Sequence, residues 1–362
     1  MKAIILVGGE ATRLRPLTCN TPKAMVPVLN TPFLEHVICY LNHHQVTEIV
    51  LALSQGQQAI ENYFGDGSRF GIRLYYSVED TPLGTGGAVK NAEKYLDETF
   101  LVLNGDIFTD LDITAMMELH RDRKAKITIS LTPVDDPTSY GLVETNAQGR
   151  ITRFLEKPSP SEVTTNMINA GIYIIEPDVL THIPPQVSFS FERELFPPLL
   201  DRGEPVYAYD SSAYWIDIGA PEKYLQLHRD LLNGKSSHYT PSSEKLIGEH
   251  SNIHPTAQIN GPVVVGDNCN IESKVKLTGP VVIGSGCTIQ SEAIIEDSVI
   301  WHNVQVGPRA VVKSCILANG CCLNADCIVQ DSTLGDNVIV VNGCQLKPAS
   351  KIWPGTRVEA DT

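Results

Sequence analysis

The sequence predicts an α/β domain followed by a parallel β-helix, and three observations support this prediction. Over the first part of the chain, short aliphatic runs alternate with segments of helical spacing. A polar stretch rich in Ser and Pro then interrupts the pattern, and beyond it apolar residues recur every six positions. We therefore expect a first domain over residues 1–233, a linker over residues 234–250 and a repeat domain over residues 251–362.

The first domain is built of strands and helices in turn. The expected strands cover residues 2–7, 48–53 and 100–103, and the expected helices cover residues 33–41, 87–96, 112–123 and 222–232. This alternation is typical of a Rossmann-like fold, with a mostly parallel, mixed sheet that helices cover on both faces. Ligands of such sheets bind at the carboxyl ends of the strands. Three segments that follow strands are therefore candidate site segments: Gly8-Gly9, Asn104-Gly105-Asp106 and Trp215-Ile216-Asp217.

The repeat domain carries the hexapeptide pattern of a left-handed parallel β-helix. The expected inward-facing residues are Ile253, Ile259, Val265, Ile271, Leu277, Ile283, Ile289, Ile295 and Trp301 and, after five-residue slips, Val306, Val312, Leu317, Leu323, Val329, Leu334 and Val340. A small or β-branched residue stands two positions before most of them. Five of these small residues are cysteines: Cys269, Cys287, Cys315, Cys321 and Cys327. We expect them to pack as small hydrophobic side chains rather than to form disulfides or bind metal.

Composition and charge exclude several classes of partner. The chain has 28 Lys and Arg against 42 Asp and Glu, a formal net charge of −14, so nucleic acid and anionic membrane would be repelled over most of its surface. No apolar run approaches the ~20 residues that span a bilayer, and the apolar stretch at residues 3–7 is too short for a signal peptide. The nine cysteines include no CxxC pair and no zinc spacing. We therefore expect a cytoplasmic protein with reduced thiols and with neither nucleic acid nor membrane as a partner.

The strongest motif is LVGGEATRLRPLT at residues 6–18, followed closely by PKAMVP. Gly8 and Gly9 allow backbone N–H groups to come close to a ligand. Arg13 and Lys23 add positive charge, and a guanidinium can bind two phosphate oxygens at once. The motif is neither a Walker A loop nor the dinucleotide-binding GxGxxG. From the residues alone, a phosphate-binding loop is favoured over an ordinary turn with solvated arginines.

The whole pattern resembles the sugar nucleotidyltransferases, also called sugar-1-phosphate pyrophosphorylases, whose signature is GGxGTRLxPLT followed by a PK pair. The likeness continues through six further segments in order: Pro82-Leu-Gly-Thr-Gly-Gly87, Asn104-Gly-Asp106, Tyr140-Gly-Leu-Val-Glu144, Phe154-Leu-Glu-Lys-Pro158, Asn169-Ala-Gly-Ile-Tyr173 and Trp215-Ile-Asp-Ile-Gly219. Within this family, the PLGTGG loop and the appended hexapeptide domain are most similar to mannose-1-phosphate guanylyltransferases. One position departs from the signature, because Ala11 stands where the family has its third glycine. We expect its methyl group to be tolerated unless the backbone at Ala11 is left-handed.

The resemblance implies a reaction in which a sugar-1-phosphate oxygen attacks the α-phosphorus of a nucleoside triphosphate and pyrophosphate leaves in line. Such a reaction needs no protein nucleophile, so catalysis rests on positioning and charge neutralisation. Mg²⁺ is the expected cofactor, because it takes one or two carboxylates together with substrate phosphates. Asp106 and Asp217, each at a strand end, suit that role, whereas a single aspartate at such a place often only caps a helix.

The resemblance also assigns the site residues. The expected catalytic residues are Arg13, Lys23, Asp106 and Asp217. The expected nucleotide-binding residues are Gly8, Gly9, Arg13, Lys23, Gly84 and Asp106, and the expected metal ligands are Asp106 and Asp217. The expected sugar-phosphate-binding residues are Gly141, Glu156, Lys157 and Asn169. In this scheme Arg13 and Lys23 stabilise the charge that develops on the leaving pyrophosphate.

Several alternatives to this interpretation stay open. The expected substrates are GTP and mannose-1-phosphate, and the alternative is glucose-1-phosphate with dTTP, UTP or ATP, since a few backbone contacts decide the choice of base. A non-catalytic regulatory subunit that binds nucleotide-sugar is a further alternative, but such a subunit should lack a metal carboxylate or a phosphate-binding cation. An acyltransferase activity of the β-helix is disfavoured, because His254 and His302 are expected to be solvated between the coils.

The β-helix is expected to assemble subunits rather than to perform chemistry. Four of its outward positions are apolar, namely Val264, Val282, Ile294 and Ile300, and such residues favour burial against a neighbour. A homo-oligomer, most simply a dimer or a dimer of dimers, follows from this expectation. In the alternative, the β-helix is a monomeric spacer whose faces are covered by the catalytic domain. The fragment 1–235 is expected to retain metal-dependent transfer.

Overall fold

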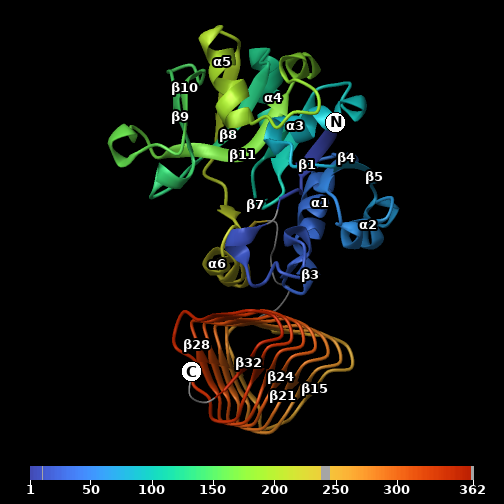
Figure 1. Ribbon diagram of the computed structural model, residues 1–362, viewed down its shortest axis with the longest axis vertical. Coiled ribbons are helices and arrows are strands. Elements are labelled where there is room, and N and C mark those ends of the chain that lie inside the picture. The colour runs from blue at the N-terminus through green and yellow to red at the C-terminus, as the bar shows by residue number, and fades with distance from the viewer. Residues whose placement is uncertain (10, 238–244, 360–362) are drawn as a thin grey trace. The chain divides into compact units, whose positions relative to one another are not determined.

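The computed structural model describes residues 1–9, 11–237 and 245–359 (Figure 1). The chain forms two compact units that do not follow its order: Met1–Gly9 with His36–Trp215, and Glu10–Glu35 with Ile216–Thr362. Residues 10–35 and 216–233 therefore group with the β-helix, whereas the sequence places them in the first domain. Of the expected linker at residues 234–250, residues 238–244 lie outside the described residues.

The first unit is built on a nine-stranded mixed sheet. Its strands are β1 (Lys2–Leu6), β4 (Glu48–Ser54), β5 (Arg73–Glu79), β6 (Phe100–Asn104), β8 (Ile127–Pro133), β9 (Gly141–Thr145), β10 (Ile151–Glu156), β11 (Met167–Ile175) and β12 (Val206–Asp210). The order is β10-β9-β11-β6-β1-β4-β5, with β8 beside β11 and β12 beside β8. Strands β5, β4, β1 and β6 are parallel, whereas β11 runs antiparallel to β6, β8 and β9. This arrangement confirms the expected Rossmann-like mixed sheet.

The helices between these strands confirm the expected alternation. They are α1 (Phe33–His43), α2 (Gln58–Phe64), α3 (Gly84–Asn91), α4 (Ile113–Arg123) and α5 (Phe196–Asp201), and the short strand β7 is Ile107–Thr109. Asp112 begins α4, because its carboxylate accepts a hydrogen bond from the Ala115 N–H group at 3.0 Å. The helix expected at residues 87–96 starts earlier and ends at Asn91, and a 3-10 turn follows it. The central strands β1 and β6 are buried on both faces, which explains why they are continuous aliphatic runs.

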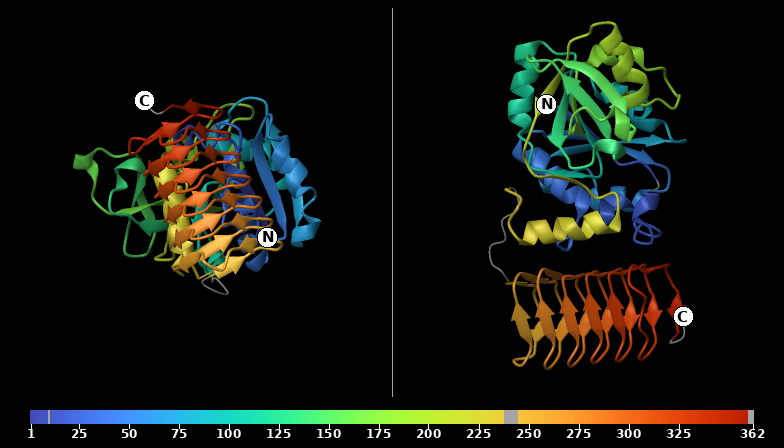
Figure 2. Two further views of the ribbon diagram at one scale, coloured as in Figure 1. Left: turned by 90° about the horizontal axis from the view of Figure 1, so that it is seen from below. Right: turned by 90° about the vertical axis from the view of Figure 1, so that its left-hand side faces the viewer.

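The second unit contains the β-helix, whose coils are stacked in Figure 2. One of its parallel sheets consists of β14 (Lys245–Ile247), β17 (Val263–Val265), β20 (Val281–Ile283), β23 (Val299–Ile300), β26 (Ile316–Leu317), β29 (Thr333–Leu334) and β31 (Lys351–Ile352). A second consists of β15 (Asn252–Ile253), β18 (Asn270–Ile271), β21 (Thr288–Ile289), β24 (Gln305–Val306), β27 (Cys322–Leu323), β30 (Ile339–Val340) and β32 (Arg357–Val358). The third consists of β16 (Gln258–Asn260), β19 (Lys276–Thr278), β22 (Ile294–Glu296), β25 (Val311–Lys313) and β28 (Ile328–Gln330). This all-parallel arrangement confirms the expected β-helix.

The remainder of the second unit consists of short elements and one helix. These are the 3-10 turns η1 (Thr12–Leu14) and η2 (Lys23–Met25), the strands β2 (Pro27–Val28) and β3 (Thr31–Pro32), and the helix α6 (Pro221–Leu232). The strand β13 (Trp215–Asp217) begins on the last residue of the first unit and ends in the second. The helix expected at residues 222–232 is thereby confirmed. It is amphipathic, and its buried side includes Tyr224, Leu227 and Leu231.

The β-helix core confirms the expected role of the cysteines. All five predicted inward cysteines are buried in the core as free thiols. Burial raises the pKa of Cys315 and of Cys321 to about 12 in each case, so these thiols keep their protons at neutral pH. They therefore serve as small apolar side chains between the coils.

The inward position assigned to Trp301 is wrong. Ile300 pairs with Ile283 and lies in the core, whereas Trp301 is outside this core cluster. The five-residue slip lies between Ile295 and Ile300, one repeat earlier than the sequence pattern suggested, and Val282 accordingly pairs with Val299 rather than with Ile300. Both Ile300 and Trp301 are large and apolar, so the pattern alone does not show which of them turns inward.

One outer face of the β-helix is already covered within this chain. Its outward column is Val264, Val282, Val299, Ile316 and Thr333, which follow one another in register across five strands. These residues are between 1% and 8% exposed. Of the four apolar residues expected to meet a neighbouring subunit, Val264 and Val282 are therefore buried in the single chain, and Ile300 faces the core. Ile294 is half-buried on another sheet, and a homo-oligomer through the β-helix stays a prediction.

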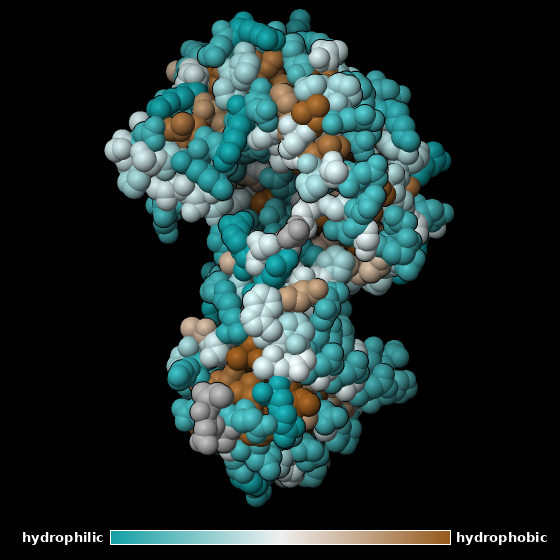
Figure 3. Space-filling view, viewed as in Figure 1, coloured by the Kyte–Doolittle hydropathy of each residue, from teal (hydrophilic) through white to brown (hydrophobic). Residues whose placement is uncertain are grey.

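Hydrophobic residues are visible at the end of the β-helix nearest the C-terminus (Figure 3). Trp353 is 54% exposed in this last part of the domain. Among the described residues, every helix is too short or too polar to span a bilayer.

Candidate active site

The glycine pair after β1 lies where β1, β4 and β6 end in register. A Cβ atom on Gly8 would lie 3.0 Å from Glu79 Oε1 and 3.1 Å from Ser54 Oγ, so glycine lets these side chains approach the backbone. The Gly9 N–H group donates to Ser54 Oγ at 3.3 Å, and its φ of +111° suits glycine alone. The structure therefore places Gly8 and Gly9 at the carboxyl edge of the sheet, where the sequence predicts the ligand.

Asp106 follows β6 at the same edge. Gly105 turns the chain across β1: its N–H group donates to Leu6 O at 2.9 Å, and a Cβ atom there would lie 2.5 Å from the same oxygen. Asp106 is half-buried directly after this turn. Asn104 Oδ1 is buried and has no hydrogen-bond partner among the described residues, although buried acceptors are normally paired. The end of β6 therefore presents a carboxylate and an unsatisfied acceptor beside the strand that carries the glycine pair.

Gly84 begins α3 and packs against the segment around Phe189. Its φ is +69°, and a Cβ atom on it would lie 2.9 Å from Phe189 O. The N–H groups of Gly86 and Gly87 donate to that same oxygen at 2.8 Å and 3.1 Å. The glycines of this loop thus have a packing role, and two N–H groups of the first turn are bound to protein. The expected contact of Gly84 with a nucleotide stays a prediction.

The pairing of β9 with β10 brings together three of the expected sugar-phosphate residues. Gly141 lies opposite Glu156 in the register, and a Cβ atom on Gly141 would lie 3.0 Å from Glu156 Oε2 and 2.7 Å from Phe154 Cζ. Lys157 follows directly, and its N–H group donates to Tyr140 O at 2.9 Å. The φ of Lys157 is +53°, and its side chain is exposed. The Glu156 carboxylate therefore lies against Gly141, and the exposed Lys157 directly follows it in the chain.

Asn169 joins this group from β11, which pairs with β9 one residue away. Its Nδ2 group donates to Tyr173 Oη at 2.8 Å, and its Oδ1 atom accepts from the Gly171 N–H group at 3.0 Å. Tyr173 is fully buried and donates to Glu192 Oε1 at 3.1 Å. Burial raises the pKa of Tyr173 well above its ordinary value, so the hydroxyl keeps its proton. These contacts fix the orientation of the Asn169 amide.

Glu192 is a site candidate that the sequence did not reveal. Its carboxylate also accepts hydrogen bonds from Thr85 Oγ1 at 2.8 Å and from Ser190 Oγ at 2.7 Å. Burial raises the pKa of Glu156, and the negative charge of Glu192 raises it further. The sugar-phosphate group of residues therefore contains two interacting carboxylates. Glu192 belongs to no motif that we recognised in the sequence. The one hint in the sequence is that this acidic residue directly follows Phe191, which is buried.

In the second unit, Arg13 and Asp217 meet over Gly219. A Cβ atom on Gly219 would lie 2.9 Å from Arg13 Nη2 and 3.0 Å from Asp217 Oδ2, so glycine provides the space in which they approach. Asp217 is 7% exposed and forms an ion pair with Lys223 of α6. The structure therefore unites two of the expected catalytic residues and adds Lys223, which the sequence analysis did not single out.

The loop that carries Arg13 and Lys23 contains the departure from the family signature. Ala11 has φ of 45° and ψ of 42°, which is the left-handed conformation. We expected the methyl group of Ala11 to be tolerated unless the backbone there is left-handed, and the backbone is left-handed. This conformation costs a residue with a side chain about 1–2 kcal/mol. The Ala11 carbonyl accepts hydrogen bonds from Thr18 Oγ1 at 2.9 Å and from the Leu14 N–H group at 3.1 Å. These bonds hold the loop in the conformation that glycine would adopt freely.

The two histidines of the β-helix differ in their surroundings. His254 is exposed, as expected. His302 is half-buried, and its Nδ1 atom accepts a hydrogen bond from the Ser285 N–H group at 3.0 Å. Burial lowers the pKa of His302, which favours the neutral ring that this bond requires. The expectation that both histidines are solvated is therefore wrong for His302, which joins two coils.

Comparison with known proteins gives the family of both parts of the chain. Residues 2–234 match the family described as nucleotidyl transferase, and residues 259–362 match the GMPPB C-terminal domain. The chain is 37% identical over 270 residues to the mannose-1-phosphate guanylyltransferase of Mycobacterium tuberculosis, which covers 73% of this chain and 74% of that protein. It is 36% identical over 330 residues to the UTP–glucose-1-phosphate uridylyltransferase of Synechocystis sp., covering 86% and 85%. The crystal structure of HddC from Yersinia pseudotuberculosis is similar with a TM-score of 0.55 and 33% identity, covering 62% of this chain and 97% of that one.

Proposed function

Because the chain belongs to the nucleotidyl transferase family, we propose that it transfers a nucleotidyl group from GTP to mannose-1-phosphate and releases pyrophosphate. The choice of substrates follows the names of relatives from M. tuberculosis and Yarrowia lipolytica, the latter 38% identical over 270 residues. HddC, which is similar in structure, has been solved in complex with GMP-PN. The observation that carries the proposal is the cluster of Gly141, Glu156, Lys157 and Asn169 on three adjacent strands.

The acceptor end of the site would be formed by this cluster. Lys157 would bind the phosphate of the sugar phosphate, and Glu156 would accept hydrogen bonds from sugar hydroxyls. Asn169 would add a further polar contact, in an orientation that Tyr173 and Glu192 fix through hydrogen bonds. Because the phosphate oxygen attacks the α-phosphorus directly, its alignment by these residues supplies a large part of the rate enhancement.

The nucleotide end of the site would be formed by the signature loop. Arg13 and Lys23 would bind the triphosphate and stabilise the negative charge that develops on the leaving pyrophosphate. Because Gly219 has no Cβ atom, the Arg13 guanidinium and the Asp217 carboxylate can both lie close to this position before substrate binds. This preorganisation avoids the cost of rearranging the charged groups during the reaction.

Asp106 and Asp217 would hold Mg²⁺, which supplies positive charge to the phosphates when it is bound. Both offer the carboxylate oxygens that this ion prefers, and Asp217 forms an ion pair with Lys223. In the described part of the chain, no three His, Cys, Asp or Glu side chains form a metal cage. Mg²⁺ needs no such cage, since water and substrate phosphates complete its coordination. These residues therefore fit the ion.

The proposed substrates are tested by measuring pyrophosphate release over a matrix of GTP, UTP, dTTP and ATP against mannose-1-phosphate and glucose-1-phosphate. We expect the pair of GTP and mannose-1-phosphate to give the highest kcat/KM. A preference for UTP and glucose-1-phosphate would instead match the Synechocystis relative. Absence of turnover with every pair, together with binding of nucleotide-sugar, would contradict the enzymatic proposal and favour a regulatory subunit.

The raised pKa of Glu156 predicts how acceptor use depends on pH. As the pH falls, a carboxylate with a raised pKa gains its proton at a pH above the ordinary value of 4.5, and it then loses an acceptor for sugar hydroxyls. Replacing Glu192→Gln removes the negative charge that contributes to this shift. We therefore expect the acid limb of kcat/KM for the sugar phosphate to move to lower pH in E192Q than in the parent protein. Glu144→Gln on the neighbouring strand is the matched control, and an equal movement in that variant would contradict the assignment.

A further inference from the structure

A buried column of polar groups connects the β-helix to the signature loop within the second unit. Trp301 of the β-helix is 1% exposed, and its Nε1–H group donates to Tyr224 Oη at 3.0 Å. The Tyr224 hydroxyl in turn donates to Pro27 O, and the tyrosine ring is fully buried. Burial raises the pKa of Tyr224 far above its ordinary value, so this hydroxyl keeps the proton that it donates. One hydroxyl group thus joins a coil of the β-helix, helix α6 and the loop that follows Lys23.

Two further contacts hold this loop on either side of Lys23. Asn20 Nδ2 donates to Asp336 Oδ2 at 3.0 Å, and Asn30 Nδ2 donates to Ile283 O at 2.9 Å. Both partners belong to the β-helix, and they lie on different coils from Trp301. Lys23 itself lies on a single 3-10 turn, which has little stability of its own. The coils of the β-helix therefore hold the chain shortly before and shortly after this residue.

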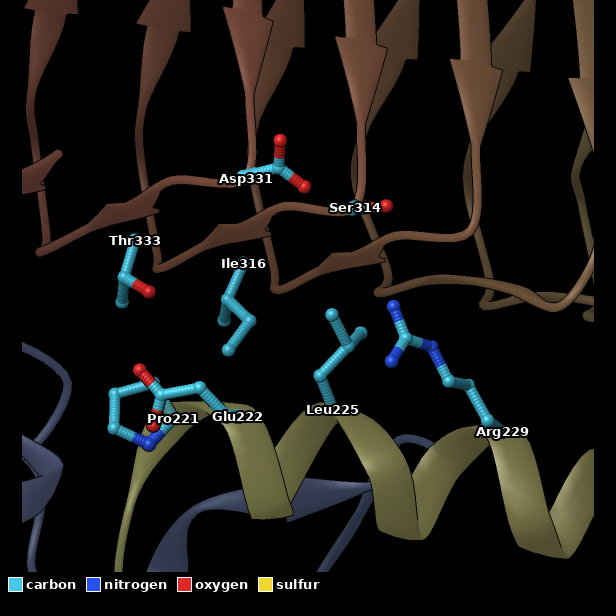
Figure 4. Close-up of a pocket in the computed structure, with 8 residues that line it drawn as sticks. All are labelled: Pro221, Glu222, Leu225, Arg229, Ser314, Ile316, Asp331 and Thr333. Carbon is cyan, nitrogen blue, oxygen red and sulfur yellow. The ribbon is translucent and has the colours of Figure 1, made fainter. Parts of the chain in front are cut away.

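Side chains of helix α6 also face those of the β-helix across a pocket, as Figure 4 shows. Arg229 Nε donates to Asp297 Oδ1 at 2.8 Å, and the second guanidinium nitrogen donates to Oδ2 at 2.5 Å. Leu225 and Ile316 point toward each other across the same interface and line a cavity of about 230 Å³. Because this part of the interface is not tightly filled, specific polar contacts are needed to fix the position of α6.

From these contacts we infer that Trp301 and Tyr224 are positioning residues for Lys23, so that the β-helix is part of the support of the nucleotide end of the site. The inference rests on the proposed function for the role of Lys23. It also changes the expectation for the fragment 1–235, which would lack Trp301, Asp336 and Ile283. The β-helix performs no chemistry in this scheme, but the loop depends on it for its geometry.

The test uses the full chain with Tyr224→Phe, which removes the hydroxyl and keeps the aromatic ring, and with Trp301→Phe, which replaces the indole and its N–H group with a smaller phenyl ring. We expect KM for the nucleotide to rise about 5- to 20-fold, which is the cost of a lost buried hydrogen bond, while KM for the sugar phosphate changes less than about twofold. Tyr40→Phe is the matched control, because Tyr40 is a buried tyrosine of the first unit whose hydroxyl also donates to a backbone oxygen, that of Leu111. It should leave both KM values unchanged. Asn30→Ala serves as a second variant if an aromatic substitution prevents folding, and the same selective rise is expected.

Two additional measurements separate positioning from general destabilisation. In a Lys23→Ala background, Tyr224→Phe should change the nucleotide KM by less than about twofold, because its effect passes through Lys23. Hydrogen exchange of the backbone amides at residues 23–30 should be about tenfold faster in Y224F than in the parent protein. Unchanged exchange would overturn the inference whether or not the proposed reaction is correct. A rise of both KM values to the same extent, or full additivity with Lys23→Ala, would also overturn it.

Discussion

Replacing Asp217 or Asp106 with alanine is expected to lower kcat by about 1,000-fold or more, a loss on the order of 4 kcal/mol of transition-state stabilisation. Each carboxylate stands at the end of a strand, where a substrate phosphate and its cation would be bound. Asp217 lies near Arg13 at Gly219 and forms an ion pair with Lys223, so alanine would remove an anion that has a cation as its partner. Initial rates measured as a function of Mg²⁺ concentration test this expectation.

The control for Asp217 is Asp230→Ala, because Asp230 is a buried carboxylate of α6 that forms a comparable ion pair with Lys235 at 2.7 Å. The control for Asp106 is Asp112→Ala, which removes a helix cap in the same unit and should reduce stability by about 1 kcal/mol. Neither control should abolish turnover. A Mg²⁺-dependent rate within about tenfold of the parent rate in D106A or D217A would show that the altered residue is not a metal ligand.

The second large effect is expected from the two lysines of the proposed site, each of which should affect the use of a different substrate. Lys157→Ala is expected to raise KM for the sugar phosphate about 10- to 100-fold, because it removes a charge-assisted contact to phosphate. Lys23→Ala is expected to impair nucleotide use by a similar factor and to lower kcat, since its charge also stabilises the leaving pyrophosphate. Steady-state kinetics with each substrate varied in turn measures both effects. The exposed residue Lys94 supplies the control substitution.

The outcome that would contradict this division is an equal change in both KM values in both lysine variants. Such a result would mean that each lysine binds a group common to the two substrates. It would not affect the proposed metal-binding role of Asp106 and Asp217, because that role is tested through the Mg²⁺ dependence of the rate. The two sets of variants therefore test separate parts of the proposed site.

Much of the fold could be predicted because its elements carry strong local patterns. Strands such as β1 and β6 are short aliphatic runs, and the β-helix repeats its inward residue every six positions. The shift at Trp301 could not be predicted, because Ile300 and Trp301 are both large and apolar and either could face the core. Only the pairing of Val282 with Val299 shows that Ile300 is the inward residue. The grouping of residues 10–35 with the β-helix is likewise absent from any local pattern, since it depends on contacts between distant segments.

Site residues that belong to a sequence motif could be predicted, whereas residues that only contact such a motif from another segment could not. The register of β9 and β10 brings Gly141 and Glu156 together as the resemblance implied. Glu192 escaped notice because it acts through the hydroxyl of Tyr173, and the sequence does not show which buried acid such a hydroxyl meets. Lys223 escaped notice for the same reason, because its partner Asp217 lies on a different element. Contacts between side chains on different helices and strands depend on how these elements pack, and the spacing of residues in the sequence does not predict them.

The grouping of residues 10–35 with the β-helix has a consequence for the nascent chain. Asn20 and its partner Asp336 are separated by 316 residues, and Asn30 is separated by 253 residues from Ile283, whose carbonyl it binds. At about 5–20 residues per second, the ribosome needs roughly 16–60 s to make the segment between Asn20 and Asp336. During this time the signature loop has been synthesised, but the coils that hold it have not. Pairings of such high contact order form late, so the signature loop reaches its final geometry only after nearly the whole chain has been translated.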